Sequence, residues 1–130
     1  MELRVVEKGE HFSIYAVVKE TGKCEVLDFL QAQEKDNYDN CITFLRLTER
    51  MVNVGKIQNK EQFRKVEGTK FFEFKPGNIR VLCFFDAGRI IICTHGFIKK
   101  RQKTPRKEIK KAEQIRDEYF LAKRNDKLTF

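Results

Sequence analysis

Basic side chains are concentrated in the second half of the chain. The 130 residues include 27 Lys and Arg and 19 Asp and Glu, which gives a formal net charge of +8. Residues 69–130 hold 16 basic and 7 acidic side chains, whereas residues 1–68 hold 11 basic and 12 acidic. Within Lys99–Lys111 one acid, Glu108, accompanies eight cations. A concentrated patch attracts phosphate groups better than scattered charge does, so this segment predicts an anionic partner.

The residues near this patch suit phosphodiester chemistry on RNA. An arginine fork such as Arg80 can bind two phosphate oxygens at once. A histidine such as His95 exchanges protons near neutral pH, and a lysine does so when neighbouring cations lower its pKa. RNA supplies its own nucleophile, the 2′-hydroxyl, so cleavage needs alignment, proton transfer and charge stabilisation but no metal.

A hairpin is expected to bring these groups to one rim of a sheet. If Ala87-Gly88 is a two-residue turn, Arg80 faces His95 across the hairpin, and the disulfide Cys83–Cys93 is disfavoured because the two side chains lie on opposite faces. A two- or four-residue loop after Lys75 adds Glu73 and Lys75 to the Arg80 face. A three-residue loop adds Lys70 and Phe72 instead.

Each of these residues also has a structural alternative. Arg80 suits an exposed strand end or a pair with Glu73, and the run Lys99–Lys111 suits the solvated start of a helix. A histidine near a strand end, like His95, is often a hydrogen-bonded structural residue, and Glu73 suits a salt bridge as well as a catalytic base.

The hydrophobic pattern predicts an α+β domain spanning residues 1–130, with the tail from about residue 124 frayed. Short loops predict antiparallel pairing of the central strands. The segment 55–68 is expected to be a connection, and Thr104-Pro105 to start the last helix. The predicted strands cover residues 3–6, 12–18, 70–75, 80–86 and 89–97, and the predicted helices cover 24–33, about 36–54 and the segment that follows Pro105.

The cysteines and the apolar runs exclude several classes of protein. Cys24, Cys41, Cys83 and Cys93 lack the two-residue spacing of zinc and redox motifs, so buried free thiols and no metal site are expected. The chain has no signal-peptide core and no apolar run of 18 residues, so we expect a cytoplasmic protein without a membrane span.

Several segments resemble the phage-related, HigB-like branch of the RelE/ParE toxin superfamily. They are Glu73-Phe-Lys75, Asn78-Ile-Arg-Val-Leu-Cys-Phe-Phe-Asp86, His95-Gly-Phe-Ile-Lys-Lys100, Gln102-Lys-Thr-Pro105, and Glu108-Ile with Ala112. The resemblance is best over residues 70–120, and Phe97-Ile-Lys-Lys followed by Lys103-Thr-Pro105 is its most specific part. It implies a RelE-like fold, a small antiparallel sheet packed by two N-terminal helices and one C-terminal helix.

The resemblance also implies a function. It suggests the toxin of a type II toxin–antitoxin pair, a metal-independent mRNA endonuclease acting on the ribosome and neutralised by an antitoxin, often a helix-turn-helix protein. Alternatives are a ParE-like toxin that poisons gyrase without catalysis and an inactive RNA-binding module of phage origin.

The resemblance places Arg80 where the family's strand arginine grips the scissile phosphate. Tyr119, the C-terminal tyrosine, falls on an apolar stripe and is expected in the core, which leaves the general acid unassigned. The candidate catalytic residues are Arg80, His95, Lys99, Lys100 and Glu73. The candidate RNA-binding residues are Lys70, Lys75, Arg101, Lys103, Arg106 and Lys107.

Overall fold

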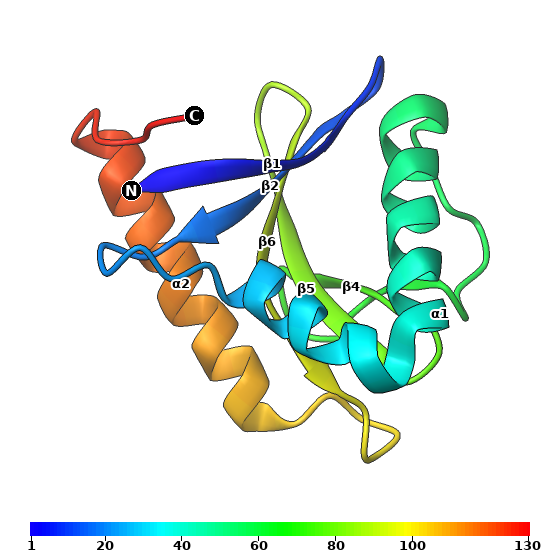
Figure 1. The fold of residues 1–130 in the computed structure, drawn as a ribbon. Helices are drawn as coiled ribbons and strands as arrows, with labels where there is room; N and C mark the ends of the chain where they lie inside the picture. Colours follow the sequence, from blue (N-terminus) through cyan, green and yellow to red (C-terminus); the bar gives the residue numbers. More distant parts are fainter.

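A six-stranded mixed sheet forms the centre of the protein, as a computed structural model of residues 1–130 shows (Figure 1). The elements along the chain are β1 (Glu2–Lys8), β2 (Ser13–Val18), α1 (Glu25–Val54), β3 (Phe63–Lys65), β4 (Phe72–Phe74), β5 (Ile79–Asp86), β6 (Ile90–Ile98) and α2 (Arg106–Arg124). The strand order is β1-β2-β6-β5-β4-β3, with every pair antiparallel except β2 and β6. Neither helix is both long and apolar enough to cross a membrane.

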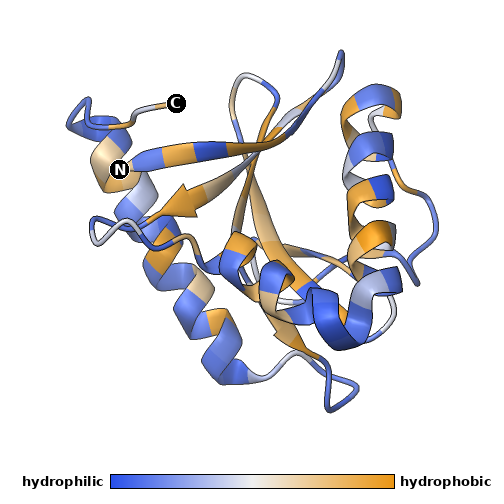
Figure 2. Cartoon of the chain, in the orientation of Figure 1, coloured by the Kyte–Doolittle hydropathy of each residue, from blue (hydrophilic) through white to orange (hydrophobic).

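The two helices cover opposite faces of the sheet and close two separate cores. Side chains of α1, including Phe44 and Met51, pack with β5 and β6 residues such as Val81 and Ile91 on one face. Residues of α2 cover Leu82, Phe84 and Ile92 on the other. Figure 2 shows the hydrophobic colour concentrated on the sides of the helices that face the sheet and the hydrophilic colour on their outer sides. Strand β5 lies inside the sheet between these two layers, so Ile79–Phe84 is buried on both sides.

The predicted small antiparallel sheet with two N-terminal helices and one C-terminal helix is wrong. The sheet is mixed because β2 pairs with β6 in parallel, and β3 extends it from within the expected connection. The N-terminal helical region is one element, α1, in which Asn37 departs from helical geometry (φ −142°, ψ 34°) before the helix resumes. A parallel pairing between distant strands leaves no local signature, and a three-residue strand is too short to show alternation.

The hairpin of β5 and β6 also differs from the expected register. Its turn has three residues, Ala87–Arg89, with Gly88 (φ +82°) and Arg89 (φ +60°) both left-handed. Beyond the pair Cys83–Cys93 a bulge at Thr94 shifts the register once more. Leu82 therefore faces His95, and Arg80 faces Phe97 instead of His95.

This register also changes the positions of the cysteines. Cys83 and Cys93 are paired residues on the α1 face, contrary to the expected separation, yet both remain free thiols. All four cysteines are buried and free as predicted, and burial raises the pKa of Cys93 to about 12. At the C-terminus, where fraying was expected, Thr129 bridges Glu2 and the ring of Phe130 packs on Tyr15.

The close approach of α1 to β6 generates a stability prediction. A Cβ atom added at Gly96 would lie 2.5 Å from Cδ2 of Phe29, closer than packed carbons tolerate. Gly96→Ala should therefore lower the free energy of unfolding by about 1–3 kcal/mol in urea denaturation. In a Phe29→Ala background the same substitution should cost much less. An equal cost in both backgrounds would contradict the clash.

Candidate functional site

The guanidinium of Arg80 is buried near the start of β5, at the rim of the sheet. The side chain is 6% exposed and lies on the α2 face. Its Nη1 donates hydrogen bonds to the carbonyl oxygens of Gly77 (2.7 Å) and Ile79 (2.8 Å). Its Nε and Nη2 groups bond to no protein atom and remain open to solvent. Burial lowers the pKa of Arg80, but an arginine pKa is so high that the group stays charged at neutral pH.

A small pocket opens over this guanidinium beneath the loop that joins β6 to α2. We name residues 99–105 the basic loop; together with Glu73, Arg80 and Phe97 it lines the pocket. The backbone N–H of Lys99 donates to the carbonyl oxygen of Asn78 (2.8 Å), which ties the start of the loop to the turn before β5. The loop's cations, Lys99, Lys100, Arg101 and Lys103, are all exposed. The pocket therefore offers free N–H donors at its base and positive charge around its rim, a combination that binds anions.

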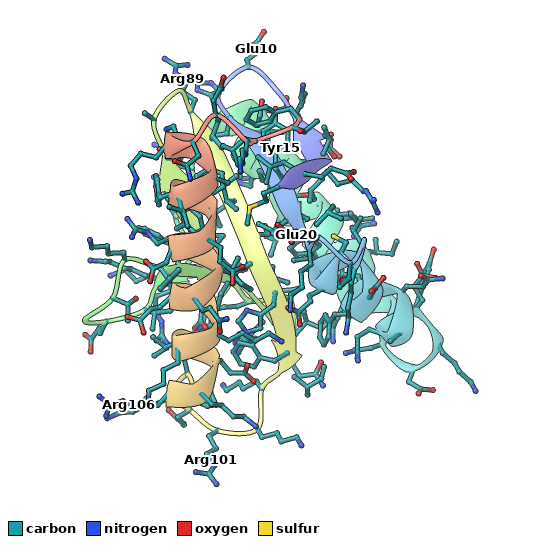
Figure 3. The ribbon with its side chains drawn as sticks, turned by 90° about the vertical axis from the view of Figure 1, so that its left-hand side faces the viewer. Glu10, Tyr15, Glu20, Arg89, Arg101 and Arg106 are labelled. Carbon is teal, nitrogen blue, oxygen red and sulfur yellow. The ribbon has the colours of Figure 1, made fainter.

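The basic loop lies at one end of the molecule, opposite the tip of the β5–β6 hairpin. Figure 3 shows Arg101 and Arg106 at one end and Arg89, at the tip of the β5–β6 hairpin, at the other. Arg106 and Lys107 are exposed in the first turn of α2, directly after the basic loop. Lys70 lies apart, in a separate depression between the loop before β4 and Arg116 of α2. The structure thus brings six predicted residues to the pocket: Glu73, Arg80, Lys99, Lys100, Arg101 and Lys103.

Glu73 occupies the middle of β4 and is only 3% exposed. One carboxylate oxygen lies 3.6 Å from Nη2 of Arg64 on β3, and the other accepts a hydrogen bond from the Thr104 hydroxyl (3.0 Å). The salt bridge that the sequence left as an alternative is present, with Arg64 as the partner. A carboxylate engaged on both oxygens is poorly placed to take a proton from a substrate.

His95 is 2% exposed beneath α2 and does not line the pocket. Its Nε2 donates to Oε1 of Glu108 (3.2 Å), and its Nδ1 lies 3.1 Å from the Thr94 hydroxyl. Burial lowers the pKa of His95, although Glu108 opposes this effect. These surroundings favour the structural alternative for His95, a neutral imidazole held by two side chains.

Lys75 follows β4 and, by continuation of the β4–β5 register, lies opposite Arg80. Its Nζ donates to the carbonyl oxygen of Lys60 (3.2 Å). Burial lowers the pKa of Lys75, and the charges of Arg64 and Arg80 lower it further. Lys75 does not line the pocket over Arg80, but a lysine with a lowered pKa is suited to proton transfer.

Tyr119 is buried at the other end of the sheet, as predicted, and takes no part in the pocket. Its hydroxyl donates to Oδ2 of Asp86 (2.7 Å), and burial with the Asp86 charge raises its pKa above the ordinary value.

Sequence reasoning missed two contributors to the site. Arg64 lies in a strand too short to detect, and the hydroxyl of Thr104 bonds to Glu73 instead of capping α2, which begins after Pro105.

A larger groove, about 700 Å³, lies between the end of β2 and α2. Its lining has three lysines, Lys19, Lys111 and Lys127, and two acids, Glu20 and Glu118, so it carries less excess positive charge than the lining of the pocket over Arg80. The pocket over Arg80 has a volume of only about 10 Å³, but its charge makes it the better candidate for phosphate chemistry.

The lowered pKa of His95 predicts a pH dependence of stability. Below the ordinary value of 6.5 the unfolded chain takes up this proton more readily than the folded protein, so the free energy of unfolding should fall as pH drops from 7 to 5. One proton accounts for at most about 1.4 kcal/mol per pH unit. Urea denaturation should show a flatter pH dependence for His95→Gln. An unchanged slope in His95→Gln would refute the assignment.

Comparison with known proteins identifies the family. The family model described as "Phage derived protein Gp49-like (DUF891)" matches residues 28–117, which include every residue that lines the pocket. No curated protein matches the sequence. Gp49-like proteins fall within the RelE/HigB-type toxin superfamily, are commonly toxins of toxin–antitoxin systems and are generally nucleases. The family model covers more than half of the chain, and the protein therefore belongs to the Gp49-like family of phage-derived proteins.

Proposed function

We propose that the protein is the toxin of a type II toxin–antitoxin system and acts as a metal-independent mRNA endonuclease. The observation that carries this proposal is the pocket over Arg80, where free guanidinium N–H groups lie beneath the exposed cations of the basic loop. The toxin role common in the Gp49-like family supports it, as does the resemblance of residues 70–120 to HigB-like toxins.

In this proposal an RNA phosphate binds at the mouth of the small pocket and contacts Arg80, with Lys99 and Lys100 beside it. The adjacent 2′-hydroxyl attacks phosphorus, its proton leaves to a base, and the bond to the 5′-oxygen breaks as that oxygen gains a proton. The products are a 2′,3′-cyclic phosphate and a 5′-hydroxyl end. Arg80 stabilises the additional negative charge on the phosphoryl oxygens, and Lys75 is the proton-transfer candidate because burial and neighbouring cations lower its pKa.

The proposed substrate and partners follow from the same surface. A basic loop that projects around a small pocket suits single-stranded RNA threaded past it, as mRNA is on the translating ribosome. A neutralising antitoxin, of the helix-turn-helix kind, is the proposed protein partner, consistent with the family's toxin role.

Loss of the Arg80 fork should remove cleavage in cells. Induced wild-type protein should arrest growth, and primer extension on a reporter transcript should reveal new 5′ ends. Arg80→Gln should reduce these ends by about 10²–10³-fold, the usual cost of losing one such charge-stabilising donor. Arg89→Gln removes the same charge at the opposite end of the molecule and should behave like wild type. Growth arrest with intact mRNA and a DNA-damage response would favour the gyrase alternative and refute the nuclease.

The basic loop should dominate the salt dependence of RNA binding. For single strands the slope of log K against log salt becomes shallower by about 0.7 for each phosphate that the protein no longer neutralises. The double variant Arg101→Gln/Lys103→Gln should therefore make the slope shallower by about 1.4. Fluorescence anisotropy measures this slope with 2′-O-methyl RNA, which lacks the nucleophile. The control Arg89→Gln/Lys127→Gln removes equal charge away from the loop. Equal slopes for the two double variants would show that RNA does not bind the loop.

A further inference from the structure

A row of four side chains crosses the sheet just behind Arg80. Arg64 faces Glu73, Glu73 faces Leu82, and Leu82 faces His95 across the neighbouring strands β3, β4, β5 and β6. Since Leu82 lies two residues after Arg80 on the same strand, Glu73 and His95 flank the strand that carries the arginine, one on each side.

Both flanking residues form hydrogen bonds at the junction of the basic loop and α2. Glu73 accepts a hydrogen bond from the hydroxyl of Thr104, the next-to-last residue of the loop, and His95 donates to Glu108 in the first turn of α2. Between these two attachments Pro105 (φ −59°) turns the chain from the loop into the helix. With the Lys99–Asn78 hydrogen bond at its other end, the basic loop is fastened on both sides of Arg80.

The charges of the site explain why fastening is needed. Arg80 and four loop cations line the pocket, and Glu73 is the one acid among the lining residues. Like charges that line one small pocket repel one another. Without the carboxylate, the loop cations and Arg80 favour an open arrangement, in which the loop moves away from the sheet.

We propose that Glu73 and Thr104 form a latch that holds the basic loop over Arg80, with His95–Glu108 as a second fastening, so that Glu73 and His95 are positioning residues. The role of the latch in cleavage rests on the proposed function. The same contacts give a structural reason for Thr104 and Glu108 in the sequence motif. The Thr104 side chain joins the basic loop to β4, and the Glu108 side chain joins α2 to β6.

Limited proteolysis tests the latch without any assay of activity. Trypsin cuts after Lys and Arg, and its rate at Lys99–Lys103 reports opening of the loop. Thr104→Val keeps the side-chain shape but loses the hydroxyl, and it should raise the cleavage rate in the loop about fivefold to tenfold relative to cleavage at Arg124. Thr104→Ser keeps the hydroxyl and should restore most of the protection.

The partnership with Glu73 is tested by a double-variant cycle in the same assay. Glu73→Met, which has a similar length but no oxygen acceptor, should open the loop at least as much as Thr104→Val, and the double variant should cleave no faster than Glu73→Met alone, because both substitutions break one interaction. Additive effects, or wild-type protection in Thr104→Val, would overturn the latch. Thr104→Val leaves the buried charge in place, so the test does not depend on the folding of Glu73→Met.

RNA cleavage separates positioning from catalysis. As a positioning residue, Glu73 when replaced by Gln should mainly raise KM and leave the acid limb of the pH–rate profile in place. If Glu73→Gln instead lowers kcat and removes the acid limb of the pH–rate profile, Glu73 is the general base and the proposal is wrong. If wild-type protein cleaves no RNA, the proposed function fails, whereas the trypsin rates still decide whether the latch exists.

Discussion

A guanidinium loses hydration when it is buried, and that loss is tolerable only if protein acceptors replace water. For Arg80 these acceptors are the carbonyl oxygens of Gly77 and Ile79, and the Glu73 carboxylate contributes a favourable charge nearby. Only Nη1 is used in these bonds, so the other donors remain free for a ligand. The turn before β5, the strands β3 and β4 and the basic loop are all arranged around this one charge.

The position of Arg80 is fixed by packing as well as by hydrogen bonds. Its strand, β5, lies inside the sheet, and the two residues that follow Arg80 enter different cores, Val81 beneath α1 and Leu82 beneath α2. Interiors packed in this way resist displacement, because a shift of one side chain disturbs many neighbours. The arginine is therefore held on a rigid element, whereas the cations above it belong to a loop that depends on polar attachments. This division suits a site that must be preorganised toward the phosphate yet admit a long polymer.

Local patterns predicted much of this architecture, and the errors have identifiable causes. The positions of β5 and β6 and the helix after Thr104-Pro105 follow from alternation and turn residues, and β6 and the helix flank the basic loop that supplies most of the pocket lining. The expected register of β5 and β6 was wrong because Gly88 and Arg89 both adopt left-handed backbone geometry in a three-residue turn, and because β6 bulges at Thr94. The alternation of apolar and polar residues indicates neither feature. The contribution of Arg64 and the parallel pairing of β2 with β6 arise from contacts between distant segments. Charge clustering thus indicated the candidate site, while the contacts of individual groups followed only from the three-dimensional structure.

The central claim is that Arg80 binds a phosphate whose neighbouring ribose supplies the nucleophile. The most direct measurement compares purified wild-type protein on two oligonucleotides, an RNA and the same sequence with a single 2′-deoxyribose at the mapped cleavage site, with product ends identified by mass spectrometry. Attack by the 2′-hydroxyl predicts a 2′,3′-cyclic phosphate and a 5′-hydroxyl from the RNA and no cut at the deoxy position. Cleavage of the deoxy substrate at that same position, or 5′-phosphate ends from the RNA, would contradict it.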